Sequence, residues 1–130
     1  MTSAPARAPH PALAFAIDLV LVLVFLAIGR ATHAEPVFDP ASLVTAWPFA
    51  VGLLIGWAVI LLTRTPATGI LAGGIVWFAT LVMGMVLRVA AGGTAAVAFI
   101  IVATITLAVF LIGWRLIARL VRRVRRVRRA

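Results

Sequence analysis

Two polar residues interrupt or end long apolar runs in ways that could support chemistry. Asp18 is the single charged residue in the run from Ala12 to Ile28. A carboxylate at membrane depth costs about 2.5–3.5 kcal/mol on insertion scales, so it needs a partner from the protein or from water. Arg115 lies at a similar depth near the end of the last apolar run. We therefore predict an intramembrane Asp18–Arg115 ion pair, with a proton relay through Asp18 as the alternative.

A second set of polar residues is Arg30, His33 and Arg88. The first two follow the first apolar run, and Arg88 closes the third, so all three fall on the same predicted side of the membrane. Guanidinium groups bind carboxylate or phosphate through paired hydrogen bonds, so this cluster is a candidate anion-binding site. The alternative is that both arginines extend to lipid headgroups or pair with Glu35 and Asp39.

Other kinds of chemistry have little support in the sequence. The chain has no cysteine, which excludes disulfides, thiol catalysis and cysteine-ligated metals. We find no Ser-His-Asp set, no phosphate-binding loop and no paired carboxylates within one apolar run. His33, Glu35 and Asp39 match no metal-binding spacing. We therefore expect no catalytic residues, no metal and no cofactor, and the sequence favours a protein that is not an enzyme.

The elements that position these residues are four long apolar segments. The 130-residue chain is 65% hydrophobic and 12% charged, whereas soluble domains carry about 25% charged residues. Segments of about 20 apolar residues span a bilayer, which predicts an all-α membrane protein, a compact bundle of four transmembrane helices. The predicted spans are residues 12–28, 44–62, 67–87 and 95–117. They form a domain over residues 12–118, between a disordered cytoplasmic leader at 1–11 and an Arg-rich cytoplasmic tail at 119–130.

The distribution of arginine predicts the orientation. With the N-terminus inside, the cytoplasmic side holds Arg7, Arg64 and the eight arginines between positions 115 and 129, and the outer side holds Arg30 and Arg88. Cytoplasmic loops carry the excess of basic residues. Both termini are therefore expected on the cytoplasmic side of a bacterial inner membrane.

A cleaved signal peptide is the alternative for the first span. Thr32-His33-Ala34 resembles a cleavage site, and cleavage there would leave three spans. Asp18 inside the apolar run, and the length of that run, argue against it.

The tail repeats Val-Arg-Arg after the last apolar run. Its position directly after a span favours anionic lipid headgroups over nucleic acid as its partner. On a helix, Leu120, Val121, Val124 and Val127 would form an apolar stripe flanked by arginine. A helix lying in the headgroup plane and a solvated disordered tail both fit this pattern.

Glycines in the second and third spans predict close helix packing. Gly52-x-x-x-Gly56 and Gly69-x-x-x-Gly73 place small residues four apart, which lets helix backbones approach. Folding the two spans about Thr65 would bring Gly56 level with Gly74, as in a close hairpin. The same motif also supports a homo-oligomer or contact with another membrane protein.

These residues together form a recognisable order along the chain. Asp18, Gly29-Arg30 with His33, Pro48-Phe49, Gly84-x-x-x-Arg88 and Gly113-Trp114-Arg115 follow one another across the spans. In this order and spacing the chain resembles the domain-of-unknown-function 3054 family of prokaryotic integral membrane proteins, over roughly residues 13–118. The resemblance implies a membrane fold and a set of marked positions, and it implies no activity.

Three classes of function therefore stay open. The first is a membrane scaffold or partner subunit, which needs no catalytic set and fits the close-packing glycines. The second is a small, oligomeric, proton-coupled transporter that would use Asp18. The third is a membrane-embedded enzyme for a lipid-like substrate, which would use Arg30, His33 and Arg88.

Overall fold

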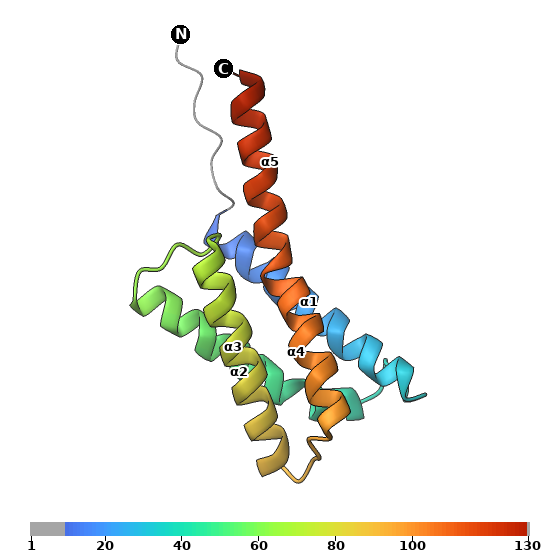
Figure 1. Ribbon diagram of the computed structural model, residues 1–130. Coiled ribbons are helices and arrows are strands. Elements are labelled where there is room, and N and C mark those ends of the chain that lie inside the picture. The colour runs from blue at the N-terminus through green and yellow to red at the C-terminus, as the bar shows by residue number, and fades with distance from the viewer. Residues whose placement is uncertain (1–9, 130) are drawn as a thin grey trace.

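The protein is all-helical over residues 10–129, the part of the chain that the structure describes. The structure is a computed structural model (Figure 1). Its helices are α1 (Pro11–Thr32), α2 (Ala41–Leu62), α3 (Ile70–Ala90), α4 (Val97–Leu111) and α5 (Gly113–Arg129). The first three, and α4 together with α5, are long and apolar enough to cross a membrane. The predicted all-α membrane fold with four spans is confirmed.

The four spanning helices form a closed ring of neighbours. Both α1 and α3 pack against α2 and α4. In Figure 1, α4 and α5 form one nearly continuous column, and α5 extends beyond the other helices. We call this side of the protein the α5 end, where α1 and α3 begin and α2 and α4 end. The far end holds the C-termini of α1 and α3 and the N-termini of α2 and α4.

The helices extend past several of the predicted span limits. α1 continues to Thr32, and α2 already begins at Ala41, which places Pro48 inside the helix. The predicted leader lies outside the described residues except for His10 and Pro11. His10 caps α1 by accepting a hydrogen bond from the backbone of Ala12 at 3.1 Å. The Arg-rich segment is helical through Arg129.

The α2–α3 hairpin is the closest contact between helices. A Cβ atom built on Gly56 would lie 2.9 Å from the Cα of Val76, and one built on Gly52 would lie 3.0 Å from the Cα of Thr80. These two glycines therefore let the backbones of α2 and α3 touch, as small residues do between membrane helices.

The expected match between Gly56 and Gly74 is wrong. No heavy atom outside its own helix turn lies within 4 Å of a Cβ built on Gly74. The hairpin is symmetric about Pro66 rather than Thr65, so Gly56 faces a residue two positions further along α3. Two residues correspond to a rotation of roughly 200° around a helix, which puts Gly74 on the opposite face.

An aromatic cluster closes the core near the far end. Phe25 of α1, Phe49 of α2 and Phe99 of α4 have ring centroids 5.9–6.3 Å apart. Gly84 of α3 makes room for them, because a Cβ there would lie 2.5 Å from Cδ1 of Phe49. The cluster fixes the positions of α1 and α4 next to the polar residues of the far end.

Candidate functional site

The charged residues inside the spans meet at the α5 end. Asp18 of α1 is fully buried and accepts hydrogen bonds from Nη1 and Nη2 of Arg115 at 2.9 and 2.8 Å. The indole nitrogens of Trp57 and Trp114 donate to the same carboxylate, each at 2.8 Å. We call these four residues the Asp18 cluster. Four donors around one carboxylate satisfy both of its oxygen atoms.

Arg115 connects this cluster to the rest of the α5 end. Its Nε donates to the carbonyl of Ala67 at 2.9 Å, and Nη1 also donates to the carbonyl of Leu111 at 2.8 Å. Its guanidinium carbon lies 4.7 Å from the ring centroid of Trp114. Gly73 makes room for this side chain, because a Cβ there would lie 2.9 Å from Cδ of Arg115. One arginine thus ties α1, the α2–α3 connection and the α4–α5 junction together.

The sequence led to two of the four residues of the Asp18 cluster. Matching depth pointed to Asp18 and Arg115, and the structure places them in one bidentate ion pair. Trp57 and Trp114 were missed as its partners. The available signal was that a buried indole N–H needs an acceptor, and Asp18 is the one carboxylate at this depth. Gly73, predicted as a helix-packing residue, makes space for a charged side chain, and Gly69 lies beside Pro66 at the start of α3.

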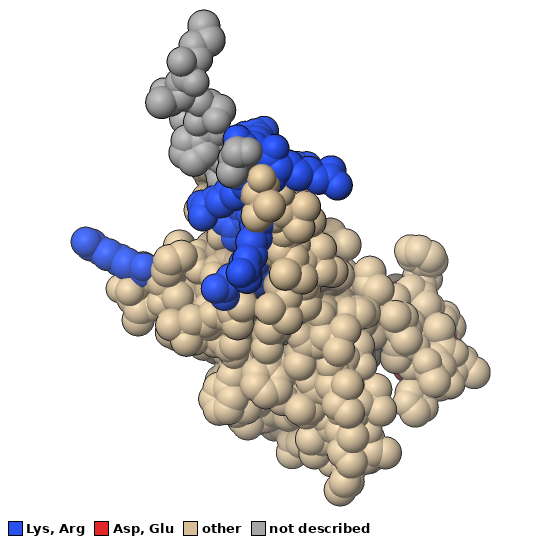
Figure 2. Space-filling model, turned by 45° about the horizontal axis from the view of Figure 1, so that its top comes forward, with Lys and Arg blue, Asp and Glu red and all other residues tan. Residues whose placement is uncertain are grey.

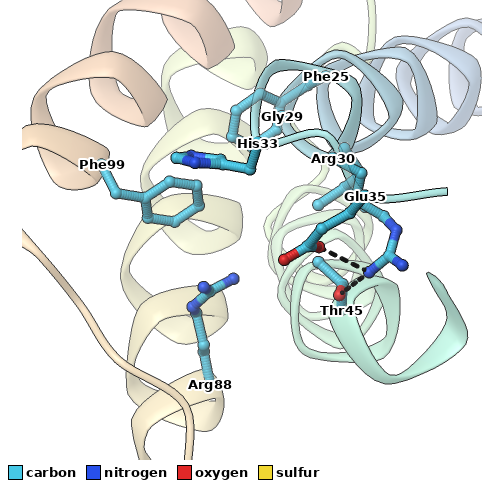
Figure 3. A pocket seen from close by; sticks show the side chains of 9 residues that line it. Phe25, Gly29, Arg30, His33, Glu35, Thr45, Arg88 and Phe99 are labelled. Atoms are coloured by element: carbon cyan, nitrogen blue, oxygen red, sulfur yellow. Dashed lines mark hydrogen bonds and ion pairs between the residues drawn. The ribbon is translucent and has the colours of Figure 1, made fainter. Parts of the chain in front are cut away.

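Arg30, His33 and Arg88 line one cavity at the far end. The cavity has a volume of about 150 Å³ and is drawn in Figure 3. All four spans contribute to its wall. Its lining residues are Phe25, Leu26, Gly29, Arg30, His33, Glu35, Thr45, Arg88 and Phe99. We call it the polar cavity.

Arg30 is already bound by the protein. Its Nη1 lies 3.2 Å from a carboxylate oxygen of Glu35 and donates to Oγ1 of Thr45 at 2.9 Å. Its Nε donates to the carbonyl of Pro36 at 2.8 Å. Arg30 is 8% exposed, whereas Glu35 is 54% exposed. Arg30 therefore fixes the loop after α1 to the start of α2, and it holds Glu35 at the edge of the cavity.

Arg88 keeps most of its hydrogen-bonding capacity. Its Nε donates to the carbonyl of Thr94 at 2.7 Å, and its guanidinium carbon lies 4.6 Å above the ring of Phe99. Within residues 10–129, its two Nη atoms, the imidazole of His33 and the second carboxylate oxygen of Glu35 form no hydrogen bond or ion pair. In Figure 3 these three side chains surround one open space.

An apolar groove continues from the polar cavity. It has a volume of about 330 Å³ and runs between α1 and α4. Its walls are formed by Phe25, Ile28, Gly29, Thr32, His33, Ala96, Ala98, Phe99, Val102 and Thr106. Phe25, Gly29, His33 and Phe99 line both spaces. The two together make a crevice with a polar end and an apolar end.

A second cavity lies at the α5 end and is strongly basic. Its volume is about 520 Å³, and Arg119, Arg122, Arg123 and Arg126 form one wall. The opposite wall is the α2–α3 connection and the start of α3. In Figure 2, basic side chains gather around α5. We call this cavity the basic cleft.

These positions coincide with a family match. The family model described as "Protein of unknown function (DUF3054)" matches residues 15–118 of the chain. The chain belongs to this family. The resemblance inferred from the order of the marked residues is confirmed, and the matched range contains the Asp18 cluster and the polar cavity. It ends at Ala118, before the arginines of the basic cleft. Comparison with curated proteins and with solved structures gave no match.

Within residues 10–129, no three His, Cys, Asp or Glu side chains are grouped as metal ligands would be. His33, Glu35 and Asp39, which the sequence placed in one loop, therefore make no such group. Asp39 instead accepts a hydrogen bond from the backbone of Ala41 at 2.8 Å, where α2 begins.

Proposed function

We propose that this multi-pass membrane protein is a rigid, non-catalytic subunit of the bacterial cytoplasmic membrane, and that it presents α5 to anionic phospholipid headgroups on the cytoplasmic side. One observation carries the proposal. The four arginines of the basic cleft form no ion pair with any residue between His10 and Arg129. Their charges converge on a cleft that holds no carboxylate of the described chain.

Phosphate is the complementary group for this cleft. Arginine binds phosphate through paired hydrogen bonds, and basic pockets on the cytoplasmic side of membrane helices recognise acidic headgroups. The N-terminus of α3, which has no acidic residue in its first turn, faces the same space and adds a partial positive charge.

The placement of charge supports the proposed orientation. Arg64 and all the arginines of α5 lie at the α5 end, and Arg30 and Arg88 lie at the far end. Basic residues are enriched on the cytoplasmic side, so the α5 end faces the cytoplasm in this proposal.

The Asp18 cluster supports a structural role over transport. A proton-coupled carrier needs its carboxylate to reach water at some point in its cycle. Asp18 is 0% exposed, and its oxygens are occupied by four N–H donors from α2 and α5. This geometry suits a fixed tie between helices, and a rigid body is what a scaffold or partner subunit requires.

The amphipathic form of α5 supports its contact with the membrane surface. Arginines cover one face of the helix, and Leu116, Leu120, Val124 and Val127 form an exposed stripe on another. Helices of this kind bind membrane interfaces with the apolar stripe while their basic face meets acidic headgroups.

Two double variants of equal charge test the cleft. Arg122→Gln with Arg126→Gln removes two lining residues, and Arg125→Gln with Arg128→Gln removes two arginines that do not line it. Each arginine near an anionic surface contributes about 1 kcal/mol, so the cleft variant should bind phosphatidylglycerol roughly 30-fold more weakly. Binding would be measured by native mass spectrometry of the full-length protein. A much smaller loss is expected for the control, and an equal loss in both would disprove binding in the cleft.

Single cysteines test the orientation, since the natural chain has none. In intact cells, Phe38→Cys in the fully exposed α1–α2 loop should react with a membrane-impermeant maleimide. Val127→Cys in α5 should react only after the membrane is permeabilised. Labelling of Val127→Cys in intact cells would overturn the proposed orientation.

A further inference from the structure

The crevice at the far end offers free cationic donors, a carboxylate oxygen without a partner among the described residues, and an apolar groove. One type of molecule is complementary to all three. We propose that it binds a zwitterionic phospholipid with a primary ammonium group, the phosphoethanolamine class. In this complex the phosphate binds Arg88 and His33, the ammonium binds Glu35, and one acyl chain lies in the apolar groove. The site is independent of the basic cleft, which lies at the other end of the helices.

The phosphate position follows from the free donors. Nε of Arg88 is held by Thr94, and its ring contact with Phe99 orients the guanidinium. Both Nη atoms stay available, so they can donate two parallel hydrogen bonds to a phosphate. The imidazole of His33 lines the same cavity and supplies a third donor.

The ammonium position follows from Glu35. A purely anionic ligand would place its charge beside this carboxylate without a compensating contact. Arg30 binds one oxygen of Glu35 at 3.2 Å, and the other oxygen has no partner among the described residues. A primary ammonium supplies the missing donors, so the cavity is complementary to a phosphate and an ammonium together rather than to either alone.

The sizes of the two spaces fit this division. The polar cavity of about 150 Å³ is the smaller of the two spaces, which suits a compact headgroup. The apolar groove of about 330 Å³ opens from it through Gly29, His33 and Phe99. Its side chains are apolar apart from two threonines and His33, as a hydrocarbon chain requires.

The test compares lipids that differ only in their headgroups. Short-chain phosphatidylethanolamine, phosphatidylglycerol and phosphatidylcholine with identical acyl chains would be titrated into the full-length protein carrying Arg122→Gln and Arg126→Gln, so that the basic cleft contributes little to the binding of any of them. Dissociation constants would be measured by native mass spectrometry. We expect phosphatidylethanolamine to bind at least about tenfold more tightly than the other two, since each of them lacks an ammonium N–H for Glu35. Equal binding of the three lipids would overturn the proposal.

Variants of the two charged groups, made in the same Arg122→Gln, Arg126→Gln background, assign the contacts. Glu35→Gln should remove the preference for phosphatidylethanolamine and leave binding of phosphatidylglycerol unchanged or stronger. Arg88→Gln should weaken both lipids about tenfold or more. Arg64→Gln, at the α5 end, changes the net charge equally and should change neither. Retention of the preference in Glu35→Gln, or of affinity in Arg88→Gln, would contradict the assigned contacts.

A third variant tests the groove without removing any polar group. Gly29 lines both spaces, and no neighbouring heavy atom lies within 4 Å of a Cβ built there. Gly29→Leu should therefore fold and fill the start of the groove with its side chain. We expect it to lose phosphatidylethanolamine binding while its thermal unfolding temperature stays at or above that of the natural protein. Undiminished binding to the folded variant would show that the chain does not occupy the groove.

Discussion

The Asp18 cluster and the polar cavity, at opposite ends of the helices, use the same charged residue types in opposite ways. At the α5 end, Asp18 and Arg115 are both fully buried, and every carboxylate oxygen is matched by donors. At the far end, Glu35 is 54% exposed, one of its oxygens is unpaired, and Arg88 meets no carboxylate of the described chain. Residue type alone therefore does not separate a structural charge from a binding charge. Burial and the number of unused hydrogen-bonding groups do.

This contrast has an energetic consequence. A buried ion pair is tolerated only when its geometry and additional hydrogen bonds offset the cost of desolvation, so losing one partner leaves an uncompensated charge. An exposed pair contributes about 0–1 kcal/mol, because water replaces either partner. Substitutions in the Asp18 cluster should therefore act on folding, and substitutions at the polar cavity should act on binding.

The strongest test of the comparison is Asp18→Asn. It removes the charge that compensates Arg115, and we expect it to lower the free energy of unfolding by about 3–5 kcal/mol. Denaturant unfolding in detergent micelles, followed by circular dichroism, would measure the change. Glu35→Gln is the matched control. Glu35 is 54% exposed and Arg30 keeps its bonds to Thr45 and Pro36, so this variant should change stability by less than about 1 kcal/mol.

A double variant distinguishes the ion pair from a general loss of packing. Asp18→Asn combined with Arg115→Gln removes both charges, so it should be less destabilised than the sum of the two single variants. Strict additivity would show that the two side chains do not stabilise each other, and the Asp18 cluster would then lose its assigned role.

The sequence predicted the parts of this arrangement that depend on length and depth. Apolar runs located the four spans, and equal depth pointed to Asp18 and Arg115. It failed where the result depends on helix rotation. A one-residue error in the centre of the α2–α3 connection shifted the expected partner of Gly56 by two residues, to Gly74 on the wrong face of α3. Rotation is set by packing between helices, which a single sequence does not encode locally.

The same limit applies at the far end. Their positions along the chain placed Arg30 and Arg88 on the same side of the membrane, as equivalent candidates for anion binding. The structure separates them, because Thr45 and Glu35 bind Arg30, whereas Arg88 meets only a backbone carbonyl and an aromatic ring. These contacts join residues from different helices, so they follow from the assembled fold.

Trp57→Phe removes one donor from the carboxylate and keeps the ring. Hydrogen bonds to charged groups contribute about 1.5–3 kcal/mol, and we expect a loss of stability in this range. Trp47→Phe is the control, because Trp47 is 42% exposed and its indole makes no hydrogen bond to the described chain. The free energy of unfolding of Trp47→Phe should stay within about 0.5 kcal/mol of that of the natural protein. Equal losses would mean that ring size, and not the bond to Asp18, determines the effect.

Neighbouring glycines provide a smaller test of the space around Arg115. In Gly73→Ala the new Cβ would lie 2.9 Å from Cδ of Arg115, so overpacking should cost about 1–3 kcal/mol. Gly74→Ala adds the same atom in open space and should stabilise α3 by up to about 1 kcal/mol through helix propensity. Unfolding of the two variants under the same conditions measures the difference. A stable Gly73→Ala would show that Arg115 has room to move.

The smallest predicted effect is a gain, at a polar group that belongs to neither end. Oγ1 of Thr80 in α3 is buried and has no hydrogen-bond partner among the described residues. Valine has nearly the same shape without the hydroxyl, so Thr80→Val should raise the free energy of unfolding by about 1 kcal/mol. Thr104→Val is the control, because its hydroxyl donates to the carbonyl of Ile100 at 2.6 Å and its replacement should be nearly neutral. A destabilised Thr80→Val would mean that the hydroxyl of Thr80 does form a stabilising hydrogen bond.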